Sequence, residues 1–406
     1  MSDYFKIARR NLFRNKRRSF ITISSVFFGV FFAVTMRSAQ IGSLGNMVDN
    51  IVKSYTGYIQ VQDTAYWEHK TINNTFKFSP DLASFLDKEK SIKHYSPRLE
   101  SFALSAFGNK SRGIMLVGID AKKEEKIIQV SKWLTGGTYL NSRSGGALIG
   151  KGVAKFLKLN IGDTITLMGV GYHGASAAGL FVVQGIVKFP SPALNGKIIF
   201  VNLKDAQEFF SAESQVSSIV LMVDGYEKVT KAAAKISKDI DKKYRVMSWM
   251  EMQPELLQFI DGKTGSATVF IFLLFLIIGF GIMGTVIMLI AERKRELGVM
   301  IALGMKRTKL SIILFIEVLL MGFVGVISAS VLTYPIFRYF EKNPIPISGE
   351  AGQMMMDMGF EPVYVFSTKP EVFTMPATIV FALIVVISLY PVWYINKIKV
   401  INALRA

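Results

Sequence analysis

The sequence predicts an integral membrane protein of four transmembrane α-helices that carries an extracytoplasmic α+β domain of two lobes with helical stalks. Three observations lead to this fold class. Four long stretches of the 406 residues are almost free of charge, a long polar segment separates the first stretch from the second, and basic residues gather on one side of the stretches. Half of the residues are hydrophobic, and their grouping into blocks is typical of membrane spans rather than of a soluble core.

The four apolar stretches define the expected spans. Each is long enough to cross roughly 30 Å of hydrocarbon as a helix that rises about 1.5 Å per residue. No small-residue cleavage site follows the first stretch, which favours a retained anchor over a secretory signal peptide. The stretches are 19–36, 267–291, 310–337 and 372–395.

Apolar residues at helical spacing flank the polar segment at both of its ends. After Arg37 the spacing continues to Val52, which predicts that the first helix extends beyond the membrane as a stalk. A matching stripe from Trp249 to Ile260 precedes the second span, with Pro254 near the start of its helix. Two hypotheses stay open: the stalks pack together and link the domain to the spans, or each stripe covers the underside of the domain.

The location of the basic residues predicts the orientation in the membrane. Residues 1–18, 291–309 and 396–406 hold 16 of the 48 Lys and Arg residues but only 3 of the 30 acidic residues. This excess on one side of the spans is the pattern of cytoplasmic loops, so both termini and the middle loop are expected in the cytoplasm. Nucleic-acid binding is not expected, because it would gather basic residues on one soluble domain. The absence of cysteine fits an oxidising exterior.

The polar segment alternates short strands with short helices, which predicts an α+β domain. The stretch 169–179, rich in glycine and alanine, is expected to be a flexible loop. Strands are expected at 58–62, 112–119, 163–168, 181–188, 197–202 and 218–223, and helices at 80–89, 151–158, 203–210 and 226–240.

No pattern of catalytic or metal-binding residues is found. The histidines His69, His94 and His173 are far apart, and none has a partner at metal-ligand spacing. The segment Gly262-Lys-Thr resembles the end of a phosphate-binding loop, but Leu257 stands where such a loop needs a glycine. The chain is therefore expected to be a non-catalytic subunit that itself binds no cofactor and no metal.

The segment 292–304 is the most informative in the sequence. Charged residues come first, apolar residues follow, and Gly304 stands where a helix cap is expected. Such an amphipathic helix fits a groove on a cytoplasmic partner, or it lies along the membrane face as an ordinary interfacial helix.

This segment resembles the coupling motif of FtsX-like permeases, the superfamily of the MacB exporter and of the lipoprotein-releasing subunits LolC and LolE, whose layout is the most similar. In the motif, E-R-x-x-E-x-G precedes A-L-G. The matching residues are Glu292, Arg293, Glu296, Gly298, Ala302, Leu303 and Gly304, while Met300-Ile301 stand where the family usually has Leu-Arg.

The resemblance extends along the chain. Residues 8–18 resemble the family's basic N-terminal helix, and residues 148–166 resemble its outer domain. Tyr390–Trp393 together with Ala403–Arg405 resemble the closing pattern of the family, with Val392 in place of the usual alanine.

The resemblance implies a permease subunit that lacks a nucleotide-binding domain, since only a short segment precedes the first span. It implies a dimer of cytoplasmic ABC ATPase subunits that bind ATP and Mg, and a second copy or a homologous permease beside this chain. It places the chain in a bacterial inner membrane with the large domain in the periplasm. The residues implied to couple to the ATPase are Glu292, Arg293, Lys294, Glu296, Gly298, Leu303 and Gly304.

The expected organisation follows from these patterns. It comprises a cytoplasmic amphipathic helix, a first span with its stalk, a MacB-like periplasmic core domain, a second span, a cytoplasmic coupling segment, a third span, an outer loop, a fourth span and a cytoplasmic tail. The corresponding ranges are 1–18, 19–42, 43–265, 266–291, 292–309, 310–338, 339–371, 372–395 and 396–406.

Three further features carry hypotheses. Glu317 lies inside the third span, where it either packs in the bundle interior and couples spans or pairs with Arg307 or Lys309. Glycines in the second span (279, 281 and 284) and in the third span (322 and 325) are expected to allow close helix approach. A greasy, polarizable patch outside the membrane either contacts a lipid-modified substrate or rests on the bilayer or the domain; it consists of Met354, Met355, Met356, Met358 and Phe360.

Three functions are consistent with this sequence. The first is extraction or movement of lipoproteins or other amphiphilic substrates at the outer face of the inner membrane, next to membrane lipids and with a periplasmic carrier or adaptor. The second is MacB-like export from the periplasm through a partner. The third is FtsX-like signalling that activates an extracellular hydrolase.

Overall fold

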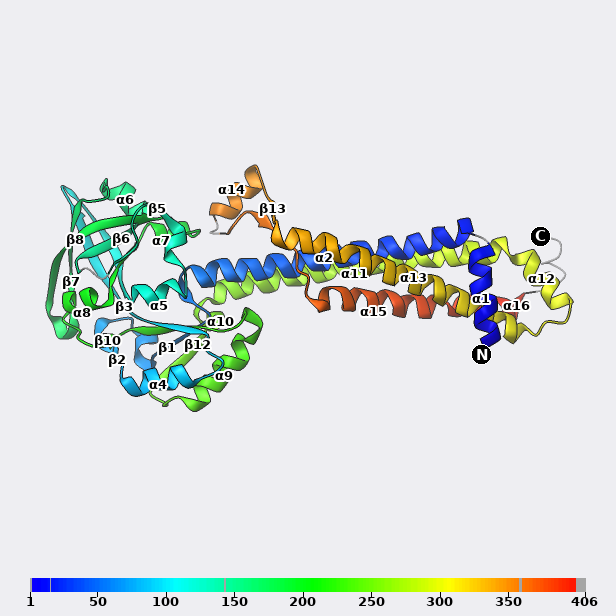
Figure 1. Ribbon diagram of the computed structural model, residues 1–406, viewed down its shortest axis with the longest axis horizontal. Coiled ribbons are helices and arrows are strands. Elements are labelled where there is room, and N and C mark those ends of the chain that lie inside the picture. Colours follow the sequence, from blue (N-terminus) through cyan, green and yellow to red (C-terminus); the bar gives the residue numbers. More distant parts are fainter. Residues whose placement is uncertain (1, 15, 142–143, 358–359, 399–406) are drawn as a thin grey trace. The chain divides into compact units, whose positions relative to one another are not determined.

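A computed structural model describes residues 2–14, 16–141, 144–357 and 360–398 (Figure 1). The predictions for Met358 and for Ala403–Arg405 lie outside these residues. The chain divides into two compact units. The helical unit comprises residues 1–44, 260–346 and 363–406, and the α+β unit comprises residues 45–259 and 347–362.

Long apolar helices dominate the helical unit. Among the described residues, four segments are long and apolar enough to cross a membrane: Ser19–Thr56, Pro254–Glu292, Arg307–Lys342 and Pro370–Lys397. The first helix continues well past Arg37, as the apolar spacing predicts. The helices are α1 Ser2–Arg14, α2 Lys16–Ile51, α11 Pro254–Glu292, α12 Lys294–Ala302, α13 Arg307–Lys342, α15 Pro370–Ile387 and α16 Leu389–Lys397, with the short pair of strands β13 Ile345–Pro346 and β14 Val363–Tyr364.

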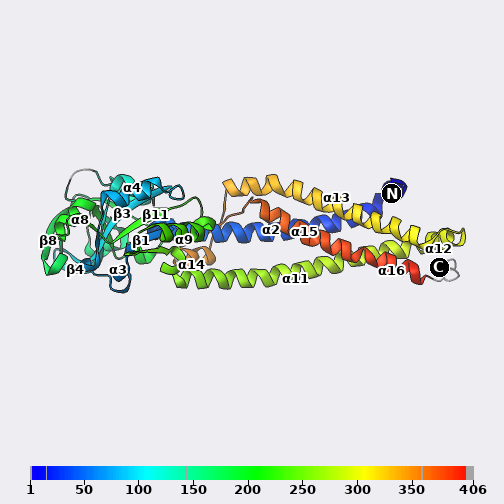
Figure 2. The ribbon, with the colours of Figure 1, turned by 90° about the horizontal axis from the view of Figure 1, so that it is seen from below.

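The third span, α13, is the helix around which the others pack. It lies beside α15 and α16 in both Figure 1 and Figure 2, and α1 crosses it near the N-terminal end of α13. A single apolar cluster joins these helices, and its fully buried members include Val30, Val286, Met321 and Val380. Such continuous apolar packing stabilises the association of helices in a membrane, where the hydrophobic effect does not drive helices together.

Glycines bring three of the helix pairs close together. A Cβ added to Gly322 would lie 2.7 Å from side-chain atoms of Ile384, and one added to Gly325 would lie 2.7 Å from Val26. The prediction of close approach is thus confirmed for the third span. It is wrong for Gly279 and Gly284 in the second span, where an added Cβ would meet nothing within 4 Å. The close contact of the second span is made instead by Gly29 of α2, 2.9 Å from Ile278.

The α+β unit is built on one large sheet. The strands follow the order β12-β1-β11-β3-β4-β9-β6-β8-β5, and β7 pairs with both β3 and β8. All pairs are antiparallel except β4–β9 and β6–β8. The strands are β1 Ile59–Asp63, β2 Phe76–Lys77, β3 His94–Phe107, β4 Lys110–Ile119, β5 Leu134–Gly137, β6 Gly146–Gly150, β7 Thr164–Val170, β8 Ser176–Val187, β9 Ile198–Asn202, β10 Gln215–Val216, β11 Ser218–Met222 and β12 Tyr244–Ser248.

The long strand β3 belongs to two regions of this sheet. Its first residues, 94–98, pair with β11, which leads to β1 and β12. Its later residues, 103–106, pair with β7, and this pairing closes a ring of six strands, β3-β4-β9-β6-β8-β7. The structure therefore has the α+β domain of two regions that the sequence predicts, with β3 common to both.

Short helices complete the α+β unit. On the strand ring, alternate strand residues such as Leu116, Ile149, Leu167 and Val201 lie in one buried cluster together with apolar residues of α6 and α8. The helical elements are η1 Val52–Thr56, α3 Thr64–Glu68, α4 Pro80–Lys88, α5 Ala121–Glu125, η3 Val130–Trp133, α6 Lys151–Leu157, α7 Pro192–Asn195, α8 Leu203–Phe209, α9 Val229–Asp239, α10 Trp249–Met252 and α14 Glu350–Asp357.

The predicted loop at 169–179 is confirmed only in its middle. Residues 169–170 end β7 and residues 176–179 begin β8, so residues 171–175 connect the two strands of this hairpin. Its small residues are needed for close packing: a Cβ on Gly179 would lie 3.2 Å from the ring of Phe209, and one on Gly171 would lie 2.5 Å from the carbonyl oxygen of Phe210. Glycine in a strand often marks such a close approach rather than flexibility.

Candidate functional site

The segment between α11 and α13 reverses the chain and contains one short helix. Helix α11 ends at Glu292, and α12 begins at Lys294. Helix α12 ends at Ala302, and Gly304, two residues later, has a φ of +91°. The N–H of Gly304 donates to the carbonyl of Ile301, and the N–H of Met305 donates to that of Met300, both at 3.0 Å. This is the Schellman arrangement of a glycine helix cap, as expected for this position.

The inner side of the segment is fixed by a buried ion pair. Arg293 is 5% exposed, and its Nη1 donates to Oε2 of Glu317 at 2.7 Å. Glu317, on α13, is 0% exposed and also accepts a hydrogen bond from Nδ2 of Asn11 at 3.4 Å. One carboxylate therefore joins the end of α11, the third span and the N-terminal helix α1. Leu297 and Gly298 are buried beside it.

Of the two hypotheses for Glu317, the position inside the bundle is confirmed. The alternative pairing with Arg307 or Lys309 is wrong: Arg307 donates instead to the carbonyl oxygens of Asn396 at 2.6 Å and Ile398 at 3.0 Å. The physical reason is distance along the helix, since Arg307 lies almost three turns before Glu317, or about 15 Å. The chain reversal at Gly304 brings Arg293 back to the carboxylate.

The outer side of the segment presents charged residues and the apolar residues Val299 and Leu303. Glu292, Glu296 and Gly304 are exposed, and Leu303 is 82% exposed. Glu296 accepts a hydrogen bond from Nη2 of Arg14 at 3.1 Å, an exposed pair of a kind that contributes little to stability. The predicted coupling residues thus fall into two groups. Arg293 and Gly298 are buried, Lys294 is half-buried, and the others face outward.

The methionine-rich segment forms part of α14 in the α+β unit. Met354 is 60% exposed and Met356 is also exposed, whereas Met355 is half-buried. Phe360 is half-buried, and its ring stacks on that of Phe259 with 5.8 Å between the ring centroids. Only part of the predicted patch therefore offers a free apolar surface.

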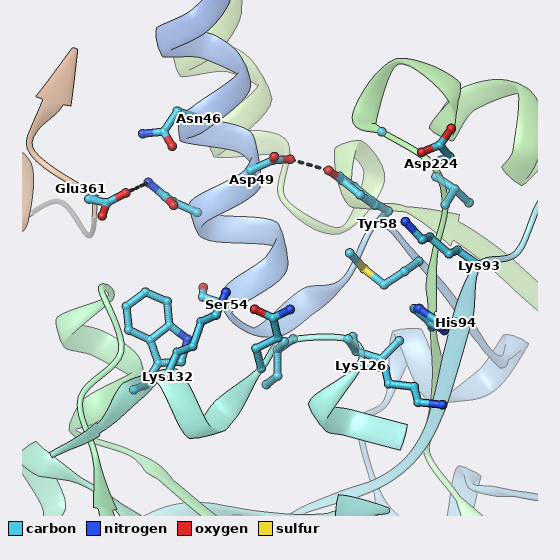
Figure 3. A pocket seen from close by; sticks show the side chains of 18 residues that line it. Asn46, Asp49, Ser54, Tyr58, Lys93, His94, Lys126, Lys132, Asp224 and Glu361 are labelled. Atoms are coloured by element: carbon cyan, nitrogen blue, oxygen red, sulfur yellow. Dashed lines mark hydrogen bonds between the residues drawn. The ribbon is translucent and has the colours of Figure 1, made fainter. Parts of the chain in front are cut away.

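Sequence reasoning missed a cavity in the α+β unit. Its volume is about 830 Å³, and its walls come from α2, η3, the end of β11 and Glu361. Figure 3 shows Asp49 bonded to the hydroxyl of Tyr58. Nδ2 of Asn50 also donates a hydrogen bond to Oε2 of Glu361 at 3.3 Å. Its lining residues are scattered over the sequence, so no local pattern indicates it. The cavity is suited to a polar ligand.

Electrostatics within this cavity follow from burial and from its lysines. Burial, and then the hydrogen bond to Asp49, raise the pKa of Tyr58 well above its usual range. Burial, and then the nearby charges of Lys126 and Lys93, lower the pKa of His94. Both groups are therefore expected to be neutral at physiological pH.

Sequence reasoning also missed an exposed apolar face on the strand ring. Phe102 is 72% exposed, and Leu104 lies directly opposite Met168 on the neighbouring strand. A face of this kind on a soluble domain marks an interaction surface. It was missed because alternation predicts one apolar face for each strand, and here the outer face is apolar as well. The exposed residues are Phe102 and Leu104 of β3, Met168 and Val170 of β7, and Leu180 and Val182 of β8.

The residues that bear on metal and phosphate binding, the three histidines and Gly262–Thr264, lie in the part of the chain that the structure describes. No group of three His, Asp or Glu residues there could hold a metal ion. Residues Gly262–Thr264 lie within α11, so they form a helix and not a phosphate-binding loop.

Comparisons with known proteins cover both units. Residues 19–239 match the family of MacB-like periplasmic core domains, and residues 268–400 match the FtsX-like permease C-terminal family. The lipoprotein-releasing system transmembrane protein LolC of Neisseria meningitidis serogroup B is 20% identical over 345 residues, which are 81% of this chain and 79% of that protein. The corresponding protein LolE of Haemophilus influenzae is 22% identical over 233 residues, 55% of each chain.

One solved structure has a similar region. The periplasmic region of MacB from Actinobacillus actinomycetemcomitans has a TM-score of 0.37 and 16% sequence identity, and the match covers 53% of this chain and 97% of that structure.

Proposed function

The chain belongs to the family of ABC-transporter permeases that combine a MacB-like periplasmic core domain with an FtsX-like C-terminal region, and from this premise we propose a specific task. The chain extracts or moves lipoproteins or other amphiphilic substrates at the outer face of the inner membrane. A separate ABC ATPase dimer hydrolyses ATP with Mg on the cytoplasmic side. The observation that carries the proposal is the coupling segment, an exposed surface built on the buried pair Arg293–Glu317.

The exposed side of α12 is the docking surface for the ATPase. Leu303 enters an apolar groove of the partner, and Glu292 and Glu296 meet basic groups around it. An exposed leucine at the tip of a rigid turn suits this task, because its burial on docking contributes about 2 kcal/mol while little side-chain freedom is lost. Both termini and residues 292–309 accordingly lie in the cytoplasm.

Movement of the docked segment is transmitted to the spans through side chains that are already in contact. Arg293 transmits this movement to α13 through its hydrogen bond to Glu317, and Asn11 of α1 donates to the same carboxylate. Helices α2 and α11 each run without a break from the helical unit into residues of the α+β unit. This chain and a second copy, or a homologous permease, thereby carry cytoplasmic work to the periplasmic domain by mechanotransmission. The substrate itself need not cross the membrane.

Reversal of charge on the docking surface tests the coupling segment. In the variant Glu292→Lys/Glu296→Lys, co-purification with the ATPase subunit is expected to weaken by ~10-fold or more, because like charges then meet across the interface. The matched control is Glu208→Lys/Glu213→Lys, which makes the same charge change at exposed positions of the α+β unit. If Glu292→Lys/Glu296→Lys still associated with the ATPase as the parent chain does, the exposed side of α12 would not be the docking surface.

The exposed methionines of α14 support an amphiphilic substrate. Methionine side chains are flexible and polarizable, so they adapt to acyl chains of different shape. Met354 and Met356 on this helix are exposed. The cavity lined by Glu361 is a second place where the substrate would contact the unit, because the cavity suits a polar headgroup.

Reconstitution in vesicles tests the substrate. The chain, its ATPase and a bilayer loaded with a lipoprotein are expected to release the lipoprotein to a soluble carrier in an ATP-dependent way. Met354→Ser/Met356→Ser is expected to lower release by ~5-fold with unchanged ATP hydrolysis, because two apolar contacts with the acyl chains are lost. Ile161→Ser, at an exposed apolar position of the same unit, serves as the control. ATP hydrolysis without any release would favour MacB-like export or FtsX-like signalling instead.

The apolar face on β3, β7 and β8 favours a soluble periplasmic partner in either kind of transport. Its residues lie on three neighbouring strands, on the side away from the buried cluster. A carrier that receives the substrate, or an adaptor that leads it onward, would cover this face.

A further inference from the structure

A buried arginine in the α+β unit holds the end of the first long helix. Helix α2 ends at Ile51 and is followed directly by a π-helical stretch, η1. The chain then turns at Gly57, whose φ is +69°. The last carbonyl groups of a helix have no partner within the helix. Here the carbonyl of Val52 accepts from the N–H of Gly57, and that of Tyr55 accepts from Nη1 of Arg98, both at 2.7 Å.

Arg98 is itself fixed in the sheet. It belongs to the part of β3 that pairs with Ser218 of β11 on one side and Ile119 of β4 on the other. Its carbonyl oxygen accepts from the N–H of Ser217 at 2.8 Å and from the hydroxyl of the same residue at 3.1 Å. Arg98 thus lies where the open region of the sheet joins the strand ring.

A second buried charge orients the guanidinium. Glu124, on α5, is 0% exposed, like Arg98. Nε of Arg98 lies 3.1 and 3.3 Å from the two oxygens of this carboxylate, and Nη2 bonds to it as well. The guanidinium also lies 4.8 Å from the centroid of the Tyr55 ring. These contacts leave Nη1 for the Tyr55 carbonyl at the end of the helix, with Oε1 of Glu100 3.7 Å from the same nitrogen.

Stability of the fold does not explain this arrangement. Removing two charges from water is costly, and well-packed apolar residues often replace a buried ion pair without loss of stability. An arginine supplies a rigid, planar guanidinium fork with more N–H donors than one carboxylate accepts. The remaining donor is used on the Tyr55 carbonyl, in the stretch where the α-helical pattern has already given way to π-helix.

We propose that Arg98 is a positioning residue for the transport cycle. By holding the Tyr55 carbonyl against the junction of the two sheet regions, it passes movement of α2 to the sheet. Without it, the π-helical stretch would absorb that movement, since departures from the α-helical pattern are where helices bend. The inference rests on the proposed function, because it assumes that ATP drives movement of α2.

The test removes the guanidinium together with the buried carboxylate that it bonds to; Glu100, whose Oε1 lies 3.7 Å from Nη1 of Arg98 and whose side chain is 17% exposed, stays in place. Arg98→Met/Glu124→Met replaces both groups by apolar side chains and is expected to fold and to hydrolyse ATP with its partner. The amides of residues 52–57 are expected to exchange hydrogen ~10-fold faster, because the helix end has lost its anchor. Glu89→Met/Lys235→Met, which removes the pair joining α4 to α9 at 2.7 Å in the same unit, is the control and leaves this exchange unchanged.

Movement is measured separately from release. The chain has no cysteine, so Lys231→Cys on α9 and Lys342→Cys on α13 introduce two unique spin-labelling sites in the reconstituted complex. ATP is expected to shift the distance between the labels in the parent chain and in the control variant, and to shift it much less in Arg98→Met/Glu124→Met. Arg98→Lys, which keeps the charge but not the fork, is expected to lie between them.

The outcomes separate the two proposals. A full ATP-driven shift in Arg98→Met/Glu124→Met, or unchanged exchange at residues 52–57, would overturn the role of Arg98. A normal shift in the parent chain without release of any lipoprotein would overturn the substrate assignment alone and leave Arg98 in its role. No shift in the parent chain would overturn both.

Discussion

Arg293→Ala is expected to destabilise the helical unit by about 3–5 kcal/mol, the largest effect of any single substitution considered, because it removes the arginine that bonds the buried carboxylate of Glu317 at 2.7 Å. Asn11 contributes only a long hydrogen bond of 3.4 Å to that carboxylate. Unfolding of the purified chain in detergent, followed with increasing denaturant, measures the change directly.

A double substitution separates charge from packing. Arg293→Met/Glu317→Leu removes both charges together and is expected to recover most of the stability lost in Arg293→Ala. In this double variant, coupling of the partner's ATP hydrolysis to movement of the spans is expected to remain impaired, because the polar contact between the end of α11 and α13 is lost. If Arg293→Ala were as stable as the parent chain, the pair would not hold this part of the bundle together.

Gly325→Leu is expected to destabilise the same unit by about 3 kcal/mol, at the upper end of the usual cost of overpacking. Even the first side-chain carbon would lie 2.7 Å from Val26 and 3.0 Å from the carbonyl oxygen of Ile23, and a backbone atom of a long helix cannot move aside. The span would have to separate from α2 to admit the larger side chain.

Gly284→Leu is the matched control, since an added Cβ there meets nothing within 4 Å. It is expected to leave unfolding of the single chain in detergent unchanged, and its better helix propensity acts in the opposite direction to a clash. Equal destabilisation by the two substitutions would show that the effect comes from leucine in a glycine-rich span and not from the contact between α13 and α2.

Features that depend on local pattern were predicted well. Hydropathy alone locates the four apolar helices, because hydrocarbon requires long uncharged segments. The capped helix at 294–302 follows from its amphipathic spacing and Gly304. The strands and helices that were predicted in the α+β unit agree closely with the observed ones, including the helix at Pro80 with its Ser79 cap, whereas β3, β5, β6 and β12 were not predicted.

Features that depend on long-range contact were not predicted. Small residues at 169–179 have the composition of a loop, yet only residues 171–175 connect the strands, and the close packing of Gly171 on Phe210 and of Gly179 on Phe209 requires small residues there. The fork of Arg98 and Glu124 joins residues on different elements, and neither belongs to a motif. The partner of Glu317 was misjudged because nearness in sequence was taken for nearness in space. Among the proposed site residues, the roles of Glu292, Glu296 and Leu303 stay predictions.

The mixture of local and non-local strand pairs in the large sheet has a consequence for how this protein folds during its synthesis. Hairpin β3–β4, closed by two residues of which Gly108 has φ +57°, can form as soon as it emerges. Strand β1, by contrast, pairs with β11, so Ile59 must wait for Leu221. Such non-local pairing is slow, and β1 stays exposed to wrong partners until most of the domain has been translocated. Folding assistance during biogenesis would therefore matter most in the interval between the emergence of these two strands.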